Sequence, residues 1–154
     1  YQHDMRLPFR INYFDGILNV FTSFGYFDTD ADHLRTLINV QKSLKPGGLF
    51  LLDFFNSEWV RKNLIRYEEK SLDGIDFMLR KTIRNNRVYK RVNFTTGGRK
   101  FVFRERVRLF DLADFQAMFK EAGLELVDTL GGYDLSPFVE KQSKRLILIA
   151  KKMT

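Results

Sequence analysis

The sequence predicts an α/β fold that carries an inserted antiparallel β-sheet. Two apolar runs of strand length, at 14–20 and 49–55, flank a segment with the periodicity of an amphipathic helix. Residues 74–110 then alternate between apolar and polar side chains, a pattern typical of antiparallel strands. The 154 residues are enough for one domain with a sizeable core.

The first strand is expected at 14–20, "FDGILNV", and a helix is expected at 31–44. Apolar side chains recur along this helix at helical spacing, so they fall on one side of it. Asp30 and Asp32 are the residue type that caps helix N-termini, and we expect them to begin the helix.

The segment "KPGG" at 45–48 is expected to end the helix, because Pro46 cannot continue it. The next strand, "LFLLDFF" at 49–55, is apolar on both faces, as in parallel strands that helices cover. Strand, helix and strand together form a βαβ unit, which is right-handed by the general rule.

A short helix near 57–65 precedes the alternating stretch, in which we expect three or four antiparallel strands. The pairs Asn85-Asn86 and Gly97-Gly98 mark tight hairpin turns, because both residue types accept a positive φ. The apolar face of this sheet is expected to consist largely of Val88, Val92, Phe94, Phe101, Phe103 and Val107.

The α/β pattern resumes with a helix at 111–123 that ends at Gly123. A strand at 124–130, a loop at 131–138 and a strongly apolar strand at 145–152 follow. The predicted organisation is therefore a core at 1–65, inserted β-hairpins at 66–110, and the last helix and two strands of the core at 111–154.

The net charge of +7 is concentrated in residues 61–108, which hold 15 lysines and arginines against five acidic residues. Either one face of an exposed sheet is solvated by these cations or the sheet binds an anionic partner. We favour the solvated face, because the cations alternate with apolar residues as an amphipathic strand requires.

The absence of cysteine excludes disulfides and thiolate metal sites, and His3 and His33 lack metal-ligand spacing, so no metal is expected. No apolar run reaches the ~18 residues that span a bilayer. The N-terminus lacks the apolar stretch of a signal peptide. We therefore expect a cytoplasmic protein without a membrane partner.

Polar and aromatic residues gather after the predicted strands of the core. Because ligands of open α/β sheets bind beyond the carboxyl ends of the strands, these loops are expected to form one site. They are Asp4-Met5-Arg6, Asn19 to Tyr26, Asp53 to Asn56, and Gly131 to Asp134. Among the aromatics, Phe21, Phe24 and Phe27 are expected in the core rather than in a ligand cage.

The order of segments resembles the class I S-adenosylmethionine-dependent methyltransferases, in particular small-molecule methyltransferases with an antiparallel insertion before the last helix. The resemblance is carried by "HDMRLPF", "FDGILNVFTSFGYF", "LKPGGLFLLDFFN", the inserted hairpins, "DFQAMFKEAGLELV" and "RLILIAKK". It implies a partial Rossmann-like methyltransferase sheet, S-adenosylmethionine as cofactor, and methyl transfer to a small-molecule acceptor.

The sequence departs from this family in one respect. It lacks the opening strand with its glycine-rich cofactor loop, and also the acidic residue that binds the ribose hydroxyls. We therefore expect the chain to correspond to the C-terminal part of a methyltransferase domain, inactive by itself and self-associating through an exposed edge of the sheet.

The resemblance implies roles for the cofactor-binding residues. Asp4 would accept a hydrogen bond from the adenine amino group, and Met5 would contact the adenine ring. Asn19, Val20 and Phe21 would line the methionine part of the cofactor. The alternative for Asp4 is a turn aspartate near a frayed terminus.

The same resemblance implies that Asp53 orients a nucleophile or acts as a base, with Tyr26 as a second catalytic residue. The alternative for Asp53 is a capping or hydrogen-bonded loop residue, and Asn56 could equally cap the following helix. The residues expected to contact the substrate are Thr22, Ser23, Asn56 and Tyr133.

A second reading is a non-catalytic binding or assembly module, in which the basic inserted sheet contacts a partner subunit or nucleic acid. Aromatic residues between lysines and arginines suit stacking with single-stranded nucleic acid. An ordinary amphipathic hairpin has the same spacing, so the sequence favours a small-molecule substrate over nucleic acid.

Overall fold

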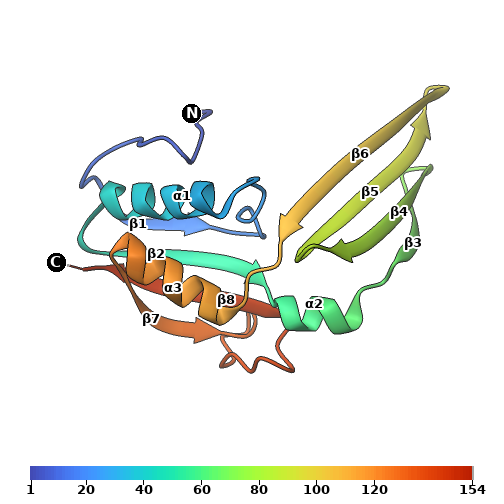
Figure 1. Ribbon diagram of the computed structural model, residues 1–154. Coiled ribbons are helices and arrows are strands. Elements are labelled where there is room, and N and C mark those ends of the chain that lie inside the picture. Colours follow the sequence, from blue (N-terminus) through green and yellow to red (C-terminus); the bar gives the residue numbers. More distant parts are fainter. Residues whose placement is uncertain (154) are drawn as a thin grey trace.

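The computed structural model describes residues 1–153, which form two four-stranded sheets and three helices (Figure 1). The first sheet has the strand order β1-β2-β8-β7. Strands β1 (Phe14–Asn19) and β2 (Leu44–Phe55) are parallel, whereas β8 (Arg145–Lys152) is antiparallel to β2 and to β7 (Leu124–Leu130). The predicted α/β fold with an antiparallel insertion is confirmed.

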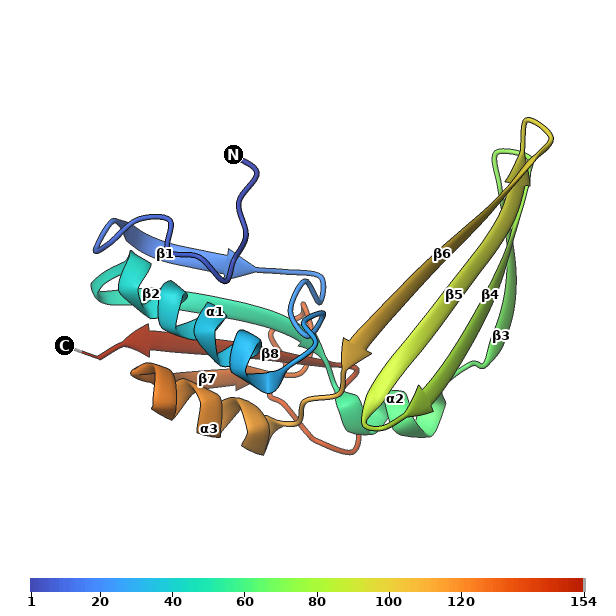
Figure 2. The same ribbon diagram turned by 45° about the horizontal axis from the view of Figure 1, so that its top comes forward.

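Helices α1 (Asp30–Ser43) and α3 (Leu112–Ala122) lie side by side on one face of this sheet (Figures 1 and 2). The core lies between these helices and the sheet, and its largest fully buried side chains include Phe24, Leu37, Phe50, Leu52, Phe54, Phe115, Phe119 and Leu148. No helix of the described residues is long and apolar enough to cross a membrane.

The prediction that Asp30 and Asp32 cap α1 is wrong. The N-cap is Thr29, whose Oγ1 accepts a hydrogen bond from the Asp32 amide at 3.1 Å. The two aspartates instead lie in the first turn, where their charge is favourable near the positive end of the helix dipole. The helix ends at Ser43, one residue before the predicted end at 44. The segment at 45–48 that was expected to end it lies inside β2, which begins at Leu44, where Phe14 pairs before a register shift.

The predicted end of α3 at Gly123 is confirmed, and the helix begins at Leu112 because Asp111 is its N-cap. Asp111 and Asp114 form a reciprocal capping box, in which each carboxylate accepts a hydrogen bond from the backbone N–H of the other. Gly123 closes the helix with a φ of 75°. The helix therefore starts and stops where its sequence signals lie.

The second sheet is an antiparallel meander of β3 (Tyr67–Leu72), β4 (Ile75–Arg84), β5 (Arg87–Thr96) and β6 (Arg99–Arg108). It projects from the end of the first sheet at which α2 (Ser57–Asn63) lies (Figure 2). The predicted hairpin turns are present: Asn85, Asn86, Gly97 and Gly98 all have positive φ. A further tight turn at Asp73-Gly74 joins β3 to β4.

Gly25 fixes the approach of the inserted sheet to the core. Its φ is 95°, and its carbonyl accepts a hydrogen bond from the Arg108 amide at 2.8 Å. A Cβ at this position would lie 2.8 Å from Val107 Cγ1 and 3.2 Å from Phe54 Cε2. Only glycine fits both the backbone angle and the space.

Gly25→Ala is expected to lower the free energy of unfolding by about 2–4 kcal/mol, because the substitution adds a clash to the cost of a positive φ. Urea denaturation measures this change. Gly98→Ala is the control, since its φ of 72° is similar but no atom lies within 4 Å of the added Cβ. An equal cost for both variants would contradict the close approach at Gly25.

Candidate active site

The strand order brings the loops after β1, β2 and β7 to one edge of the first sheet. Strand β1 is parallel to β2, and β7 runs in the same direction because both are antiparallel to β8. The carboxyl ends of these three strands therefore meet beside the start of β8 at Arg145. This is the edge that the sequence predicts as a ligand site.

Asp53 is the centre of this edge and is 1% exposed. Its Oδ1 accepts hydrogen bonds from Arg145 Nε at 2.8 Å and Arg145 Nη2 at 2.5 Å. Its Oδ2 accepts from the Phe21 amide at 2.8 Å and the Tyr133 hydroxyl at 2.9 Å. One carboxylate thus joins the loops after β1 and β7 to the first residue of β8.

The loop after β1 has an unusual backbone at this point. Phe21 and Thr22 have φ values of 57° and 58°, a left-handed conformation that is costly for residues other than glycine. The Thr22 amide donates to the Asp53 carbonyl at 3.0 Å, and Arg145 Nη2 donates to Thr22 Oγ1 at 3.0 Å. Asp53 and Arg145 therefore hold the strained pair in place.

Tyr133 reaches Asp53 from the loop after β7, and the Arg145 guanidinium lies 5.8 Å from its ring centroid. Partial burial of its hydroxyl and the hydrogen bond to Asp53 raise the pKa of Tyr133. The hydroxyl consequently remains a hydrogen-bond donor to Asp53 at neutral pH.

A cavity of about 500 Å³, here called the α2 cleft, lies between the loop after β1, helix α2 and the inserted sheet. Thr22 and Tyr26 line it from the core side, and Trp59 lines it from α2. The inserted sheet contributes Glu68, Lys70, Leu79, Lys81, Val88, Lys90, Glu105 and Val107. The cleft is thus largely apolar, with a few charged groups on one wall.

Tyr26 is 44% exposed and lines this cleft. Partial burial, together with the nearby negative charge of Glu105, raises the pKa of its hydroxyl. The charged side chains of this wall form ion pairs with one another: Lys81 Nζ lies 3.1 Å from Glu68 Oε2, and Lys90 Nζ lies 3.3 Å from Glu105 Oε2. Tyr26 therefore presents a neutral hydroxyl to the α2 cleft.

A second cavity of about 460 Å³, here called the β1 cavity, lies between the N-terminal segment, β1 and α1. Met5 and Asn19 line it, and Asn19 Nδ2 lies 3.6 Å from Met5 Sδ. Asn19 Oδ1 is buried and accepts no hydrogen bond within the described part of the chain. A buried acceptor without a donor is costly, so this atom is suited to a donor group on a ligand.

Asp4 is not among the residues that line the β1 cavity. Its carboxylate forms an ion pair with Arg6 at 2.6 Å, and hydrogen bonds from the Arg6 side chain and amide lower the pKa of Asp4 to about 2. In this structure Asp4 is therefore a turn aspartate, which is the alternative role that the sequence left open.

Four further predicted site residues line neither cavity: Val20, Phe21, Ser23 and Asn56. Asn56 is 3% exposed, caps α2, and donates to the carbonyls of Glu140 and Ser143 at 2.6 and 2.7 Å. Ser23 Oγ donates to the Val20 carbonyl at 2.7 Å. Phe21 is 78% exposed, so its expected burial in the core is wrong, whereas Phe24 is fully buried.

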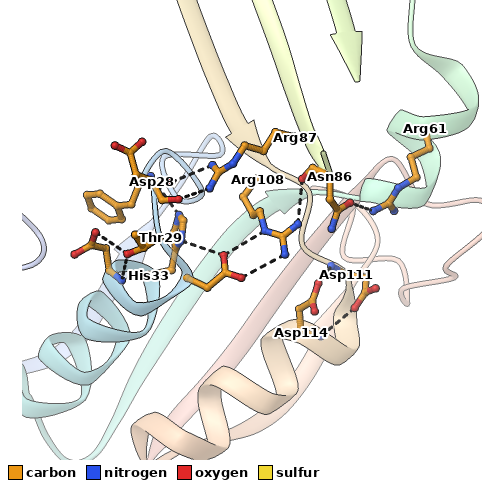
Figure 3. A network of polar contacts seen from close by, with 12 residues as sticks. Asp28, Thr29, His33, Arg61, Asn86, Arg87, Arg108, Asp111 and Asp114 are labelled. Atoms are coloured by element: carbon orange, nitrogen blue, oxygen red, sulfur yellow. Dashed lines mark hydrogen bonds and ion pairs between the residues drawn. The ribbon is translucent and has the colours of Figure 1, made fainter. Parts of the chain in front are cut away.

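A polar junction joins the inserted sheet to the core beside this site (Figure 3). Arg108 donates to both carboxylate oxygens of Asp30, at 3.2 and 3.3 Å, and to the Asn86 carbonyl at 3.2 Å. Arg87 donates to the carbonyls of Phe27 and Asp28 at 3.0 and 2.7 Å. The junction thus ties the N-terminus of α1 to the hairpins.

Sequence reasoning missed Arg145, Arg87 and Arg108. In the sequence Arg145 is the start of an apolar strand, and the other two belong to the basic hairpins. A charged residue that opens an otherwise apolar strand is the one signal that points to Arg145. Its partner Asp53 lies 92 residues away in the sequence, so the contact itself requires the strand order.

His33 is fully buried, and its ring packs against Phe24, Phe27 and Phe110 with ring centroids 5.0 to 5.3 Å away. Its Nε2 accepts a hydrogen bond from the Phe27 amide at 3.3 Å. Burial lowers the pKa of His33, although Asp30 acts against this shift. The ring therefore belongs to the core in its neutral form.

Comparisons with known proteins agree on the fold. No family model matches the sequence. The dTDP-3-amino-3,4,6-trideoxy-alpha-D-glucopyranose N,N-dimethyltransferase of Streptomyces venezuelae is 26% identical over 144 residues, which cover 86% of this chain and 59% of the relative. The chain thus spans less than two thirds of that relative.

Two solved structures are similar over nearly the whole chain. An S-adenosylmethionine-dependent methyltransferase from Clostridium acetobutylicum has a TM-score of 0.87 at 20% identity, covering 99% of this chain and 63% of its own. CalS10, an amino pentose methyltransferase from Micromonospora echinaspora, has a TM-score of 0.69 at 20% identity, covering 98% and 63%. The fold of this chain is that of class I methyltransferases.

Arg145→Ala is expected to lower the free energy of unfolding by about 3–5 kcal/mol, because it leaves the Asp53 carboxylate buried without its cation. In a double-mutant cycle with Asp53→Ala, the double variant should cost about 1–3 kcal/mol less than the sum of the single variants. Chemical denaturation measures all four proteins. Additive costs would show that the two side chains do not stabilise one another.

His33 is expected to make the protein less stable in acid. Because its folded pKa lies below the unfolded value, the unfolded chain binds the proton first, and stability falls as the pH drops below about 6.5. His33→Phe should reduce the stability difference between pH 7.5 and pH 5, and His3→Phe should not. An unchanged pH dependence in His33→Phe would contradict the neutral buried ring.

Proposed function

We propose that this chain, which has the class I methyltransferase fold, forms the part of an S-adenosylmethionine-dependent N-methyltransferase that binds its small-molecule acceptor. The observation that carries the proposal is the pair of cavities at the end of β1. Asn19 lines the β1 cavity, and Thr22, three residues later, lines the α2 cleft. A methyl group that moves from a cofactor in the β1 cavity to an acceptor in the α2 cleft would therefore pass the loop of residues 19–22.

The residues of the β1 cavity fit part of the cofactor. The unpaired Asn19 Oδ1 is suited to an amino or hydroxyl donor, and Met5, Leu7, Phe9 and Ile17 provide apolar surface for a ring. When bound, S-adenosylmethionine supplies a sulfonium methyl group as the electrophile. The chain itself would hold the cofactor at Asn19 and keep the acceptor in line with it.

The geometry favours a positioning role for the two predicted catalytic residues. Both oxygens of Asp53 already accept hydrogen bonds, so Asp53 would shape the loop of Phe21 and Thr22 rather than take a proton from the acceptor. Because the pKa of Tyr26 is raised, its hydroxyl would orient the acceptor as a neutral hydrogen-bonding group.

The nature of the acceptor is inferred from the relatives. The relative from Streptomyces venezuelae is named for an amino sugar that is joined to dTDP, and CalS10 for an amino pentose. The α2 cleft offers apolar surface from Trp59 and Leu79 as well as polar groups, which suits the two faces of a deoxyamino sugar. We therefore propose an amino sugar as acceptor.

Self-association through the open edge of β1 stays a prediction.

The proposal is tested with the full-length protein, S-adenosylmethionine labelled in its methyl group, and nucleotide-linked amino sugars. Label is expected to enter the amino sugars and not their hydroxyl counterparts. Tyr26→Phe should lower kcat/KM about tenfold, the effect of losing one hydrogen bond to the acceptor. Tyr13→Phe, an exposed tyrosine outside both cavities, should leave it unchanged.

Transfer to the hydroxyl sugars at the same rate would contradict N-methylation. Equal losses of kcat/KM in Tyr26→Phe and Tyr13→Phe would contradict binding of the acceptor in the α2 cleft.

A further inference from the structure

Three arginines form a row across the inserted sheet, on the face opposite the α2 cleft. Arg80 on β4 lies directly opposite Arg91 on β5, and Arg91 lies directly opposite Arg104 on β6. Their neighbours along the strands, such as Leu79 and Lys90, point to the other face and line the α2 cleft. All three arginines are exposed.

Such a row is unfavourable in the absence of an anion, because like charges directly opposite one another destabilise a sheet. Within residues 1–153 no carboxylate forms an ion pair with any of the three arginines. Arg80 lies over the Tyr67 ring at 5.9 Å, and Arg91 Nε donates to Asn93 Oδ1 at 3.0 Å. The lysines on the cleft face, by contrast, are paired with glutamates.

A cavity of about 890 Å³, here called the outer cavity, lies against this row. Two arginines of the row, Arg80 and Arg91, line it, and Lys70 and Lys100 are its other cations. Its other lining residues include the polar Ser71, Asn93 and Thr95 and the apolar Met78, Phe94, Phe101 and Val102.

Two carboxylates also line the outer cavity, and each accepts a hydrogen bond from a nearby hydroxyl group. Glu69 accepts from Tyr67, and Asp76 accepts from Ser71. The lining thus holds four cations against two carboxylates and is net positive.

We propose that the outer cavity binds a nucleoside diphosphate. One guanidinium group can donate to two phosphate oxygens at once. Arg80 and Arg91 lie on neighbouring strands, whose backbones are about 4.8 Å apart, and this spacing suits two linked phosphates. The volume lies in the range of small-molecule sites. Met78 and Val102, which lie on the same face as the row, offer apolar surface to a base, and Asn93 and Thr95 offer hydrogen bonds to its edge.

This site is distinct from the proposed transfer of a methyl group. Of the residues named for that reaction, none lines the outer cavity, and binding of the nucleotide is measured without a methyl acceptor. A nucleotide bound in the α2 cleft would be insensitive to Arg80, which lines only the outer cavity, so the Arg80→Thr variant described below separates the two sites.

The test is calorimetric titration of the intact protein with ADP, dTDP, adenosine, inorganic phosphate and a twelve-residue oligothymidine. ADP and dTDP are expected to bind, and adenosine and inorganic phosphate to bind at least tenfold more weakly. Affinity should fall as salt is raised. An oligothymidine that binds more tightly than either diphosphate would overturn the site in favour of a nucleic-acid surface.

Arg80→Thr and Arg84→Thr form a matched pair. Both arginines are exposed on the same face of β4 and lie over tyrosine rings, but only Arg80 lines the outer cavity. Arg80→Thr should weaken ADP binding at least tenfold, and Arg84→Thr should change it less than twofold. Equal effects would mean attraction by net charge alone and would overturn the site.

A thermal melt of the same variants excludes loss of folding as the cause. Arg80→Thr removes a like charge from the row, so its Tm without nucleotide should equal or exceed that of the wild type. A normal or raised Tm together with weakened ADP binding supports the site, and a normal Tm with unchanged binding contradicts it.

Discussion

Asp53 lies buried where three segments meet, and its carboxylate joins the loop after β1, the loop after β7 and the first residue of β8. The strained backbone of Phe21 and Thr22 persists because this carboxylate and Arg145 hold it. Charges in such a position stabilise a fold only when they are well paired, and here both oxygens are occupied. The shape of the site therefore depends on this one ion pair.

The inserted sheet adds the second wall of the site. Gly25 permits β6 to approach the core, and the contacts of Arg87 and Arg108 tie the hairpins to the start of α1. The α2 cleft exists because these contacts hold the two sheets at a fixed angle. The same loop, residues 20–29, thus serves both the ion pair at Asp53 and the junction with the inserted sheet.

Local patterns in the sequence predicted the fold well. Strands, helices and turns follow from periodicity and from capping residues that act on their neighbours, as at Asp111 and Gly123. The capping of α1 was mispredicted because Thr29, Asp30 and Asp32 all have capping side chains and lie within one helical turn, and only the backbone angle at Thr29 selects among them. Phe21 lies in a loop, where no hydrophobic periodicity indicates which side chains are exposed, so the exposure of its ring could not be predicted.

The site was predicted less completely, because its contacts join residues that are far apart in the sequence. The strand order brought Asp53, Thr22 and Tyr133 to one edge as expected. What the side chains do there could not be predicted, because it depends on Arg145, which lies opposite Phe55 and diagonally across from Asp53. Asn56 likewise has partners at Glu140 and Ser143 that local sequence does not reveal.

The central claim is that the end of β1 is the cofactor side of a methyltransferase site. The most direct measurement is a titration of the ¹⁵N-labelled intact protein with S-adenosylhomocysteine, followed by NMR. The account predicts shifts of the Asn19 side-chain amide and of the backbone amides from Asn19 to Ser23, with the amides of β4 and β5 unchanged. Shifts confined to the inserted sheet, or none at saturating ligand, would contradict it.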